Sequence, residues 1–299
     1  MQIPRSYIDN YSKALNQISY RARDSLSNAL MQLDYDMPIA DIRNAVIAVM
    51  ETACGASTEL SARLAAEFYD GMRAYSGIVD DYKAVPDSKR VPEATSGAVR
   101  AFVQDLVDGK PVEKFVHLCV DRIDYETRKA ANECVAANAR RDPKKARWAR
   151  IPTGAETCMF CIMLASRGFV YHSDETASHA HANCDCRIVP SWDKSTTVQG
   201  YDPDKYYDEW VESGFNPTSG SGGRGSSSNR AAKDLGVGGK FADSGISGMN
   251  DYLNSAKSLD ELYKRAEEVF NDIKDRWNGD SSMLASASKT AKQMRSKLS

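Results

Sequence analysis

Apolar residues in the first part of the chain recur every three or four positions. Between residues 5 and 34 they form one stripe, made of Ile8, Tyr11, Leu15, Ile18, Ala22, Leu26, Leu30 and Leu33. This spacing matches the 3.6 residues of a helical turn and predicts a long helix with one buried face. Pro38 is expected to close the segment, because proline cannot continue the helical hydrogen bonding.

The same spacing resumes at Ile39 and continues to Met72. It predicts one long helix, or two helices that meet near Gly55, because glycine weakens a helix interior. Residues 77–92 contain Pro86 and mixed charges, and they are expected to form a loop.

Two further helices are predicted at residues 93–108 and 111–140. The second helix places one set of side chains near a single face: Phe115, Cys119, Ile123, Ala130 and Cys134. Like Cys54, the cysteines of this set lie on apolar stripes, where a free cysteine behaves as a small buried hydrophobe. The solitary His117 is given no role. The first half of the chain is therefore expected to be helical.

The composition changes after the predicted body of the protein. The aromatic and acidic residues 201–215 predict a short helix or an extended segment. Residues 216–232 are rich in glycine and serine and predict a flexible linker. Within residues 233–299, Ser258 and Glu261 form a capping-box pattern ahead of an apolar stripe made of Leu262, Ala266, Phe270, Ile273 and Trp277. One amphipathic helix is expected there, packed on this chain or on a partner.

Charge and composition narrow the class of protein. The 39 basic and 41 acidic side chains give a formal net charge of −2, so no global field attracts nucleic acid or an anionic membrane. No apolar run of about 18 residues and no secretory signal pattern occurs, which predicts a protein without a membrane partner that works in a reducing cytoplasm. In that compartment, clustered cysteines more often bind metals or act as catalytic thiols than form disulfides.

Four of the seven cysteines and three of the four histidines fall within residues 158–186. Cys158 and Cys161 are separated by two residues, and after 19 further residues His181 is followed by Cys184 and Cys186. Two thiolates of one tight turn, joined by a second cluster, are typical of a tetrahedral structural zinc site. Zinc would supply folding energy to a segment that is poor in apolar residues.

The exact ligand set is open. Cys184 and Cys186 would point to opposite sides of an extended strand, so one of them is expected to be spare. The predicted ligands are therefore Cys158, Cys161, His181 and one of Cys184 and Cys186. His179 is a further candidate, since it would share a face with His181.

These patterns together predict a mainly α protein with a small α+β zinc-binding module. The expected parts are a helical N-terminal domain at residues 1–140, the Cys/His module at 141–215, a linker at 216–232 and a helical tail at 233–299.

Other classes of site match the sequence less well. A thioredoxin-like pair needs Cys-x-x-Cys at the start of a helix, and the segment from Cys158 to Gly168 fits a short helix, but a redox pair leaves the second cluster unexplained. The His-x-Glu of zinc deaminases, the His-Glu-x-x-His of zinc proteases and the Walker phosphate loop are all missing. Residues 140–150 hold six basic side chains and one acid, which fits a solvated linker better than a nucleic-acid contact.

The cysteine cluster also resembles a known family. The arrangement TC-x-x-C, H-x-x-C-x-C and a following proline resembles the C-terminal motif of the phage Mu F-like head morphogenesis proteins, in the form found in phages and prophages of Gram-positive bacteria. The residues that carry it are Thr157, Cys158, Cys161, His181, Cys184, Cys186 and Pro190, and the similarity covers residues 147–192. This chain departs from the common pattern at Ala182 and Asp185, where the family often has proline and arginine.

The resemblance implies a minor capsid protein that binds the portal and enters the procapsid, within the virion after assembly in the host cytoplasm. It implies the portal protein as partner, with the major capsid or scaffold protein as further candidates. The resulting hypothesis is a virion component without enzymatic activity. Two alternatives remain open from the sequence: an enzyme, either a head-maturation protease or a Cys-x-x-Cys thiol oxidoreductase, and a nucleic-acid-binding module with a weak DNA contact through residues 140–150.

Overall fold

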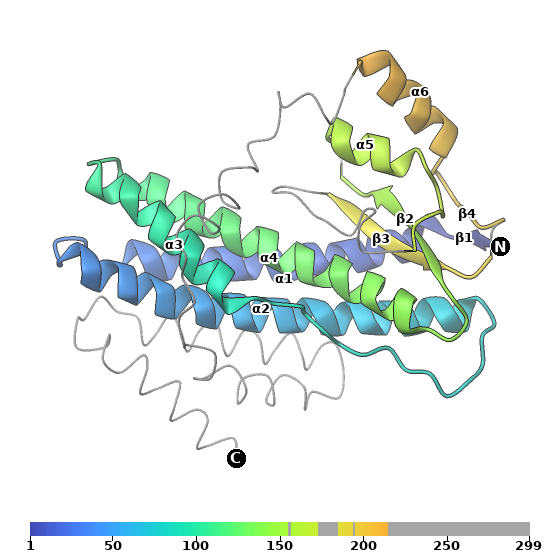
Figure 1. Cartoon of the computed structure of the whole chain (residues 1–299), viewed down its shortest axis with the longest axis horizontal. Coiled ribbons are helices and arrows are strands. Elements are labelled where there is room, and N and C mark those ends of the chain that lie inside the picture. The colour runs from blue at the N-terminus through green and yellow to red at the C-terminus, as the bar shows by residue number, and fades with distance from the viewer. Residues whose placement is uncertain (155–156, 173–184, 194, 215–299) are drawn as a thin grey trace. The chain divides into compact units, whose positions relative to one another are not determined.

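The computed structural model describes residues 1–154, 157–172, 185–193 and 195–214. Over this part the chain is mainly helical with two small two-stranded sheets, as Figure 1 shows. The helices are α1 (Arg5–Met31), α2 (Ile39–Tyr75), α3 (Pro92–Val107), α4 (Val112–Arg141), α5 (Met159–Ala165) and α6 (Pro203–Ser213). The strands are β1 (Gln2–Ile3), β2 (Arg147–Pro152), β3 (Cys186–Ser191) and β4 (Thr197–Val198). The predicted mainly helical fold with a small sheet is confirmed.

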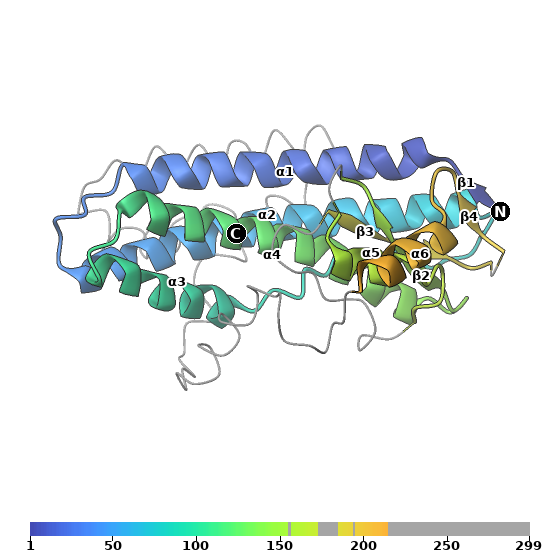
Figure 2. The ribbon, with the colours of Figure 1, turned by 90° about the horizontal axis from the view of Figure 1, so that it is seen from above.

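The four long helices end within a few residues of the predicted bounds. The helix α2 runs without a break through the buried Gly55, so the alternative of two helices is wrong (Figure 2). Within this stretch of α2, the hydroxyl of Thr58 donates a hydrogen bond to the carbonyl oxygen of Cys54, one turn earlier, at 2.7 Å. No helix among the described residues combines the length and apolar composition that crossing a membrane requires.

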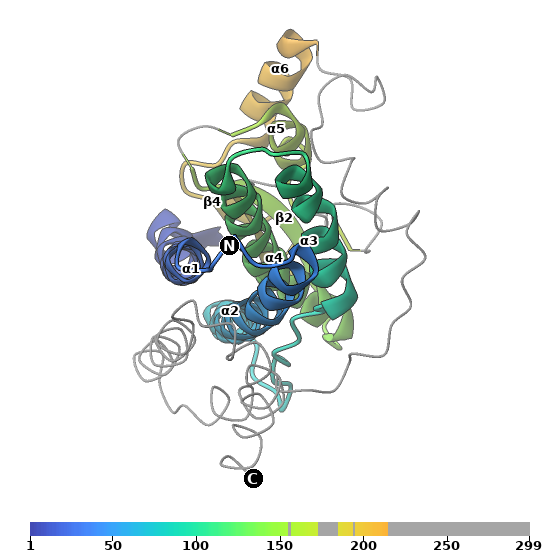
Figure 3. The same cartoon turned by 90° about the vertical axis from the view of Figure 1, so that its left-hand side faces the viewer.

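The described residues form two compact units. One unit contains residues 18–60 and 90–127 and consists of four helical segments, which Figure 3 shows running side by side. The hydroxyl of Thr127 bonds to that of Ser57 at 2.9 Å, and both side chains are buried. Burial raises the pKa of the Cys54 thiol to about 12, so this cysteine packs as a neutral core residue, as predicted.

The other unit contains residues 1–17 and 61–89 and the described residues after 127. Its centre is an antiparallel ribbon in which β2 pairs with β3, from Arg147 opposite Ser191 to Pro152 opposite Cys186. All positions of the ribbon except Arg147 are buried. In Figure 1, α5 lies between this ribbon and α6, consistent with its contacts to both.

The expectation of a solvated linker at residues 140–150 is wrong. The helix α4 continues through Arg141, and β2 begins only six residues later. Trp148 and Arg150 are 0% exposed. A strand that is buried on both faces shows no alternation of apolar and polar residues, and a buried arginine reads as a surface residue. Four basic side chains stay exposed, so the weak DNA contact remains a prediction; they are Arg141, Lys144, Lys145 and Arg147.

The short helix predicted within residues 201–215 is present as α6. Asp202 caps it by accepting hydrogen bonds from the backbone N–H groups of Asp204 and Lys205. Gly214 ends it in the left-handed conformation, with φ of 63°. The four-part domain organisation stays a prediction. Its linker at 216–232 and its tail at 233–299, with the capping box, lie outside the described residues.

Candidate metal centre

The first predicted cysteine pair lies at the start of α5. Cys158 is the N-cap residue, and its Sγ accepts a hydrogen bond from the backbone N–H of Cys161 at 3.4 Å. Cys161 lies within the first turn and is 0% exposed, whereas Cys158 is exposed. The two sulfurs of the pair therefore occupy different environments, one inside the unit and one at its surface.

Cys186 is positioned from the opposite side by β3 and α4. The side chain of Asn132 on α4 donates from Nδ2 to the carbonyl oxygen of Cys186 at 3.4 Å. Its Oδ1 accepts from the backbone N–H of Ile188 at 3.2 Å. One amide side chain thus meets a donor and an acceptor of β3, as a neighbouring strand would. Asn132 is 1% exposed, so this contact is shielded from water.

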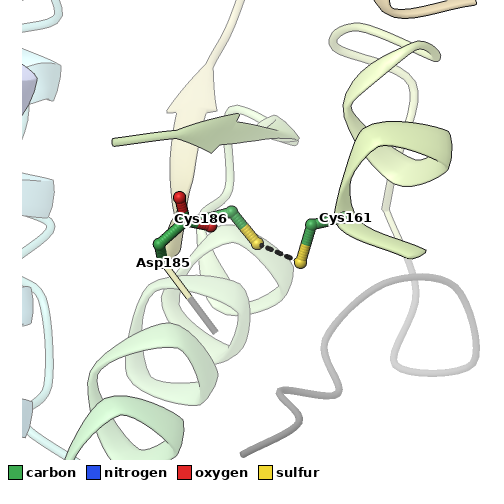
Figure 4. A group of neighbouring side chains, drawn as sticks. All are labelled: Cys161, Asp185 and Cys186. Carbon is green, nitrogen blue, oxygen red and sulfur yellow. Dashed lines mark hydrogen bonds between the residues drawn. The ribbon is translucent and has the colours of Figure 1, made fainter. Parts of the chain in front are cut away.

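The sulfur atoms of Cys161 and Cys186 point toward each other, and Sγ of Cys186 lies 3.0 Å from Sγ of Cys161 (Figure 4). This separation is too long for a disulfide, whose S–S bond is about 2.05 Å. Two thiolates that share a tetrahedral zinc ion with Zn–S of about 2.3 Å lie about 3.8 Å apart. A displacement of less than about 1 Å would therefore bring this pair to zinc geometry. The donor set fits a thiophilic metal.

A buried arginine approaches the same sulfur. Arg150 donates to Sγ of Cys186 from Nε at 3.1 Å and from Nη2 at 2.8 Å. Both side chains are 0% exposed. In the register of the ribbon, Arg150 lies opposite Ile188, so it shares a face with Cys186 two positions earlier on β3. A guanidinium stays charged in proteins, so Arg150 places a permanent positive charge beside the sulfur of Cys186.

Asp185 holds the loop before α5 against the start of β3. Its Oδ2 accepts hydrogen bonds from the backbone N–H of Gly154 at 3.0 Å and from the hydroxyl of Thr157 at 2.8 Å. The hydroxyl of Thr153 donates to the Asp185 carbonyl oxygen at 2.5 Å. Ligand atoms of Cys161, Asp185 and Cys186 lie within 4.8 Å of one another. The carboxylate is thus close to the sulfurs, but its hydrogen bonds to Gly154 and Thr157 hold the loop before α5.

We expect Gly154→Ala to destabilise the protein by about 1–3 kcal/mol, because overpacking of a filled site has this cost. A Cβ at position 154 would lie 2.4 Å from Oδ2 of Asp185 and 2.8 Å from its Cβ. Gly97→Ala in α3 is the matched control, since nothing lies within 4 Å of its added Cβ. Alanine is the better helix former, so this control should raise stability slightly. Urea unfolding of both variants measures the difference. Equal stabilities would contradict the close packing of Gly154 against the Asp185 carboxylate.

The structure brings two of the predicted ligands together, Cys161 and Cys186. Cys158 lies on the same turn as Cys161 but outside the group of mutually close ligand atoms among the described residues. His179, His181 and Cys184 lie outside the described residues. The complete ligand set therefore stays a prediction.

Comparison with known proteins places the chain in a protein family. Residues 2–213 match a family model described as VG15 protein. The chain belongs to this family. The matched region includes the helical residues of both units as well as the cysteine cluster, so the family relationship covers the sulfur pair together with its helical support.

One curated relative is the Gene 15 protein of Mycobacterium phage D29, which is 30% identical over 98 residues. The match covers 22% of this chain and 36% of that relative, so it spans about a third of the relative's length. No solved structure matches the chain. The VG15 family and this relative confirm that the protein belongs to a phage protein family, which is the coarser part of the resemblance found in the sequence.

Three residues of the centre were missed by sequence reasoning. In the sequence, Arg150 belongs to the basic segment that predicts a linker, and Asn132 is one polar residue among others on a predicted helix. Asp185 was noted only as a departure from the family pattern. The Thr153-Gly154 pair just before the cysteines was the available signal for Asp185, since a glycine permits a side chain to approach the backbone closely.

Proposed function

We propose that this protein is a minor capsid protein of a phage or prophage head, which associates with the portal during procapsid assembly and acts without enzymatic chemistry. The observation that carries the proposal is the VG15 family match over residues 2–213. The similarity to a mycobacteriophage protein and the Mu F-like cysteine motif support it. The long helices offer extended surfaces for docking, with the portal as the expected partner and the major capsid or scaffold protein as further candidates.

The proposal includes a structural zinc site. Its ligands would be Cys158, Cys161, His181 and Cys186, with Cys184 as the spare cysteine. The short distance between the sulfurs of Cys161 and Cys186 supports this choice. Zinc, when bound, would join the start of α5 to the start of β3 and stabilise the fold. Four protein ligands leave no position for a catalytic water, which agrees with a structural role.

The portal association is tested by co-expression of the full chain with the portal protein of the same phage. Gel filtration should give one complex that contains both proteins. The portal of an unrelated phage is the control and should elute separately. Two separate peaks with the cognate portal would count against the docking role, whatever the metal content of the protein.

The zinc site is tested by metal analysis of the purified full chain. We expect about one zinc per chain, which Cys161→Ser and Cys186→Ser each remove. Cys119→Ser is the matched control, because this cysteine is fully buried in the other unit. This variant should keep the zinc. Cys184→Ser should also keep it. A parent protein without zinc, or loss of zinc from Cys184→Ser alone, would contradict the ligand set.

A thiol oxidoreductase is the second candidate function. The observation that favours it is the exposed Cys158, which forms a Cys-x-x-Cys pair with Cys161 in the first turn of α5. In that case the Cys158 and Cys161 thiols should cycle with dithiothreitol in the protein as isolated. Tightly bound zinc would block this cycling, so the same preparation discriminates between the two functions.

A further inference from the structure

The helix α6, all of which lies within the described residues, contains no buried residue. It contacts α5 and lies on the far side of α5 from the β2–β3 ribbon (Figure 1). Tyr207 is 50% exposed and Val211 is 55% exposed, and they are one helical turn apart, so they form one apolar stripe. An isolated helix shorter than about 12–15 residues is marginal in water, and most helices are stabilised by burial of such a stripe. In α6 this burial is missing.

Acidic residues run beside the apolar stripe. Asp204, Asp208 and Glu212 follow one another at intervals of four residues, and all three are exposed. Like charges at this spacing destabilise a helix. The last turn of α6 contains no basic residue, so Glu212 also faces the negative end of the helix dipole. Residues that weaken their own helix at its surface indicate a face suited to contact with a positively charged surface. Together with Tyr207 and Val211, they form the acidic face of α6.

The same unit carries a surface of the opposite charge, where α4 is followed by β2. Lys144, Lys145 and Arg147 are exposed there. Two apolar residues of the loop before α3 are exposed as well, Val79 at 96% and Val85 at 48%. These five residues form the basic face.

The two segments of the basic face are held together by Arg73. Its guanidinium donates to Asp80 at 2.7 Å and to Asp142 at 2.8 Å. The loop that contains Val79 therefore lies next to the turn that contains Lys144. A nucleic acid would need only the cations of this surface, because it is bound mainly through its phosphates. The exposed apolar side chains beside the cations favour a protein partner.

We propose that this chain binds a second copy of itself head to tail, with the acidic face of α6 on one copy against the basic face of the next copy. Both faces are exposed on the same chain, so neither covers the other. Two acidic faces repel each other, and so do two basic faces, so the contact joins unlike faces. Such a contact leaves one face of each kind open, and further copies can add until a ring closes. The proposal goes beyond the proposed function, which requires no contact between copies.

The test measures self-association of the full chain by sedimentation equilibrium. The average mass should rise with protein concentration in about 50 mM salt and fall toward that of the monomer in about 500 mM salt, where charges are screened. Reversal of the acidic face by Asp208→Lys with Glu212→Lys should weaken the association at least about tenfold, because like charges then meet. Reversal of the basic face by Lys145→Glu with Arg147→Glu should have the same effect.

A mixture of the two charge-reversed variants gives the sharpest measurement. Each variant alone carries two faces of like charge, but an equimolar mixture restores attraction at both contacts and should associate like the parent. The matched control is Asp36→Lys with Asp41→Lys, which makes the same change in net charge as the α6 variant on exposed residues of the other unit. This control should associate like the parent.

Circular dichroism checks that each variant keeps its helices. If a charge-reversed variant does not fold, Tyr207→Ser with Val211→Ser takes its place, since it removes the apolar stripe at unchanged net charge. This variant should also associate more weakly than the parent.

Three results would overturn the proposal. The first is a parent that stays monomeric at every concentration in low salt, including one whose basic face binds duplex DNA instead. The second is association that both charge-reversed variants retain. The third is a mixture of folded charge-reversed variants that stays monomeric. The portal experiment tests the capsid role separately, so failure of one proposal leaves the other standing.

Discussion

Replacing Arg73 with methionine should destabilise the protein by about 3–5 kcal/mol, because it leaves a buried carboxylate without its cation. Arg73 at the end of α2 donates from Nε to Oδ2 of Asp142 at 2.8 Å and from Nη2 to Oδ1 at 3.3 Å. The side chain of Asp142 is 0% exposed and that of Arg73 is 4% exposed. Arg73 also forms two hydrogen bonds to Asp80, at 2.7 and 2.9 Å.

Asp142 connects several segments of its unit. It accepts hydrogen bonds from the hydroxyl of Tyr69 at 2.9 Å and from Nε1 of Trp192, just after β3, at 3.0 Å. The backbone N–H of Lys144 donates to it at 2.8 Å. With Arg73 gone, these neutral donors would face an anion that has lost its compensating charge. The loss should therefore loosen the end of the ribbon as well as the helix.

The same network predicts a pH dependence. Burial disfavours the charged form of Asp142, but hydrogen bonds from Arg73, Lys144 and Tyr69 outweigh this effect and lower its pKa. The hydrogen bonds from Arg73 likewise lower the pKa of Asp80 to about 2. A carboxyl group with a lowered folded-state pKa stabilises the protein fully above its unfolded pKa of about 3.9. This contribution is lost as the pH falls through the lower folded-state value.

Urea unfolding at neutral pH and near pH 3 measures both effects. The difference between the parent and Arg73→Met should shrink at the lower pH, since protonation removes the unpaired charge. Lys114→Met is the control, because Lys114 is 53% exposed and its ion pair with Asp105 should contribute less than about 1 kcal/mol. A stability of Arg73→Met within 1 kcal/mol of the parent would show that the network does not hold the unit together.

The helices could be predicted because their cores obey one period. The stripe from Ile8 to Leu30 is buried at nearly every predicted position, and the bounds of α1 follow from it. The strand β2 could not be predicted in this way. Its burial on both faces removes the alternation that marks a strand, and the fully buried Arg150 gives it the composition of a linker. The burial of Asp142 could not be predicted either, because it is the one acidic residue within the same basic segment.

The spacing of the cysteines indicated part of the site for a physical reason. Two sulfurs from separate clusters were expected to meet, and those of Cys161 and Cys186 lie in contact. The supporting residues could not be found from spacing, because they come from distant segments. Asn132 is on α4, and the hydrogen bond to the Asp185 carboxylate depends on the close approach of the Gly154 backbone. Such contacts depend on tertiary packing, which a one-dimensional pattern does not contain.

Removing the zinc that we propose at this site should lower the melting temperature by about 10 °C. A ligand present at about 1,000 times its dissociation constant stabilises the folded state by about 4 kcal/mol. For a folded region of about 200 residues, each kcal/mol corresponds to about 2–4 °C. The effect should be large here because the sulfurs of Cys161 on α5 and Cys186 on β3 lie in contact, and one ion would join them by coordination.

Differential scanning calorimetry of the full chain with and without a strong chelator measures this effect, and added zinc should restore the parent transition. The matched control is Cys186→Ser, which should already melt at the lower temperature and should not respond to the chelator. Arg73→Met should still respond, because its network lies at the other end of the ribbon, around Trp192. If the parent melts at the same temperature in both conditions, the sulfur pair is held by packing and hydrogen bonds alone. Independent responses of these two variants would mean that the ribbon is held at both ends, by coordination beside Cys186 and by an ion pair around Asp142.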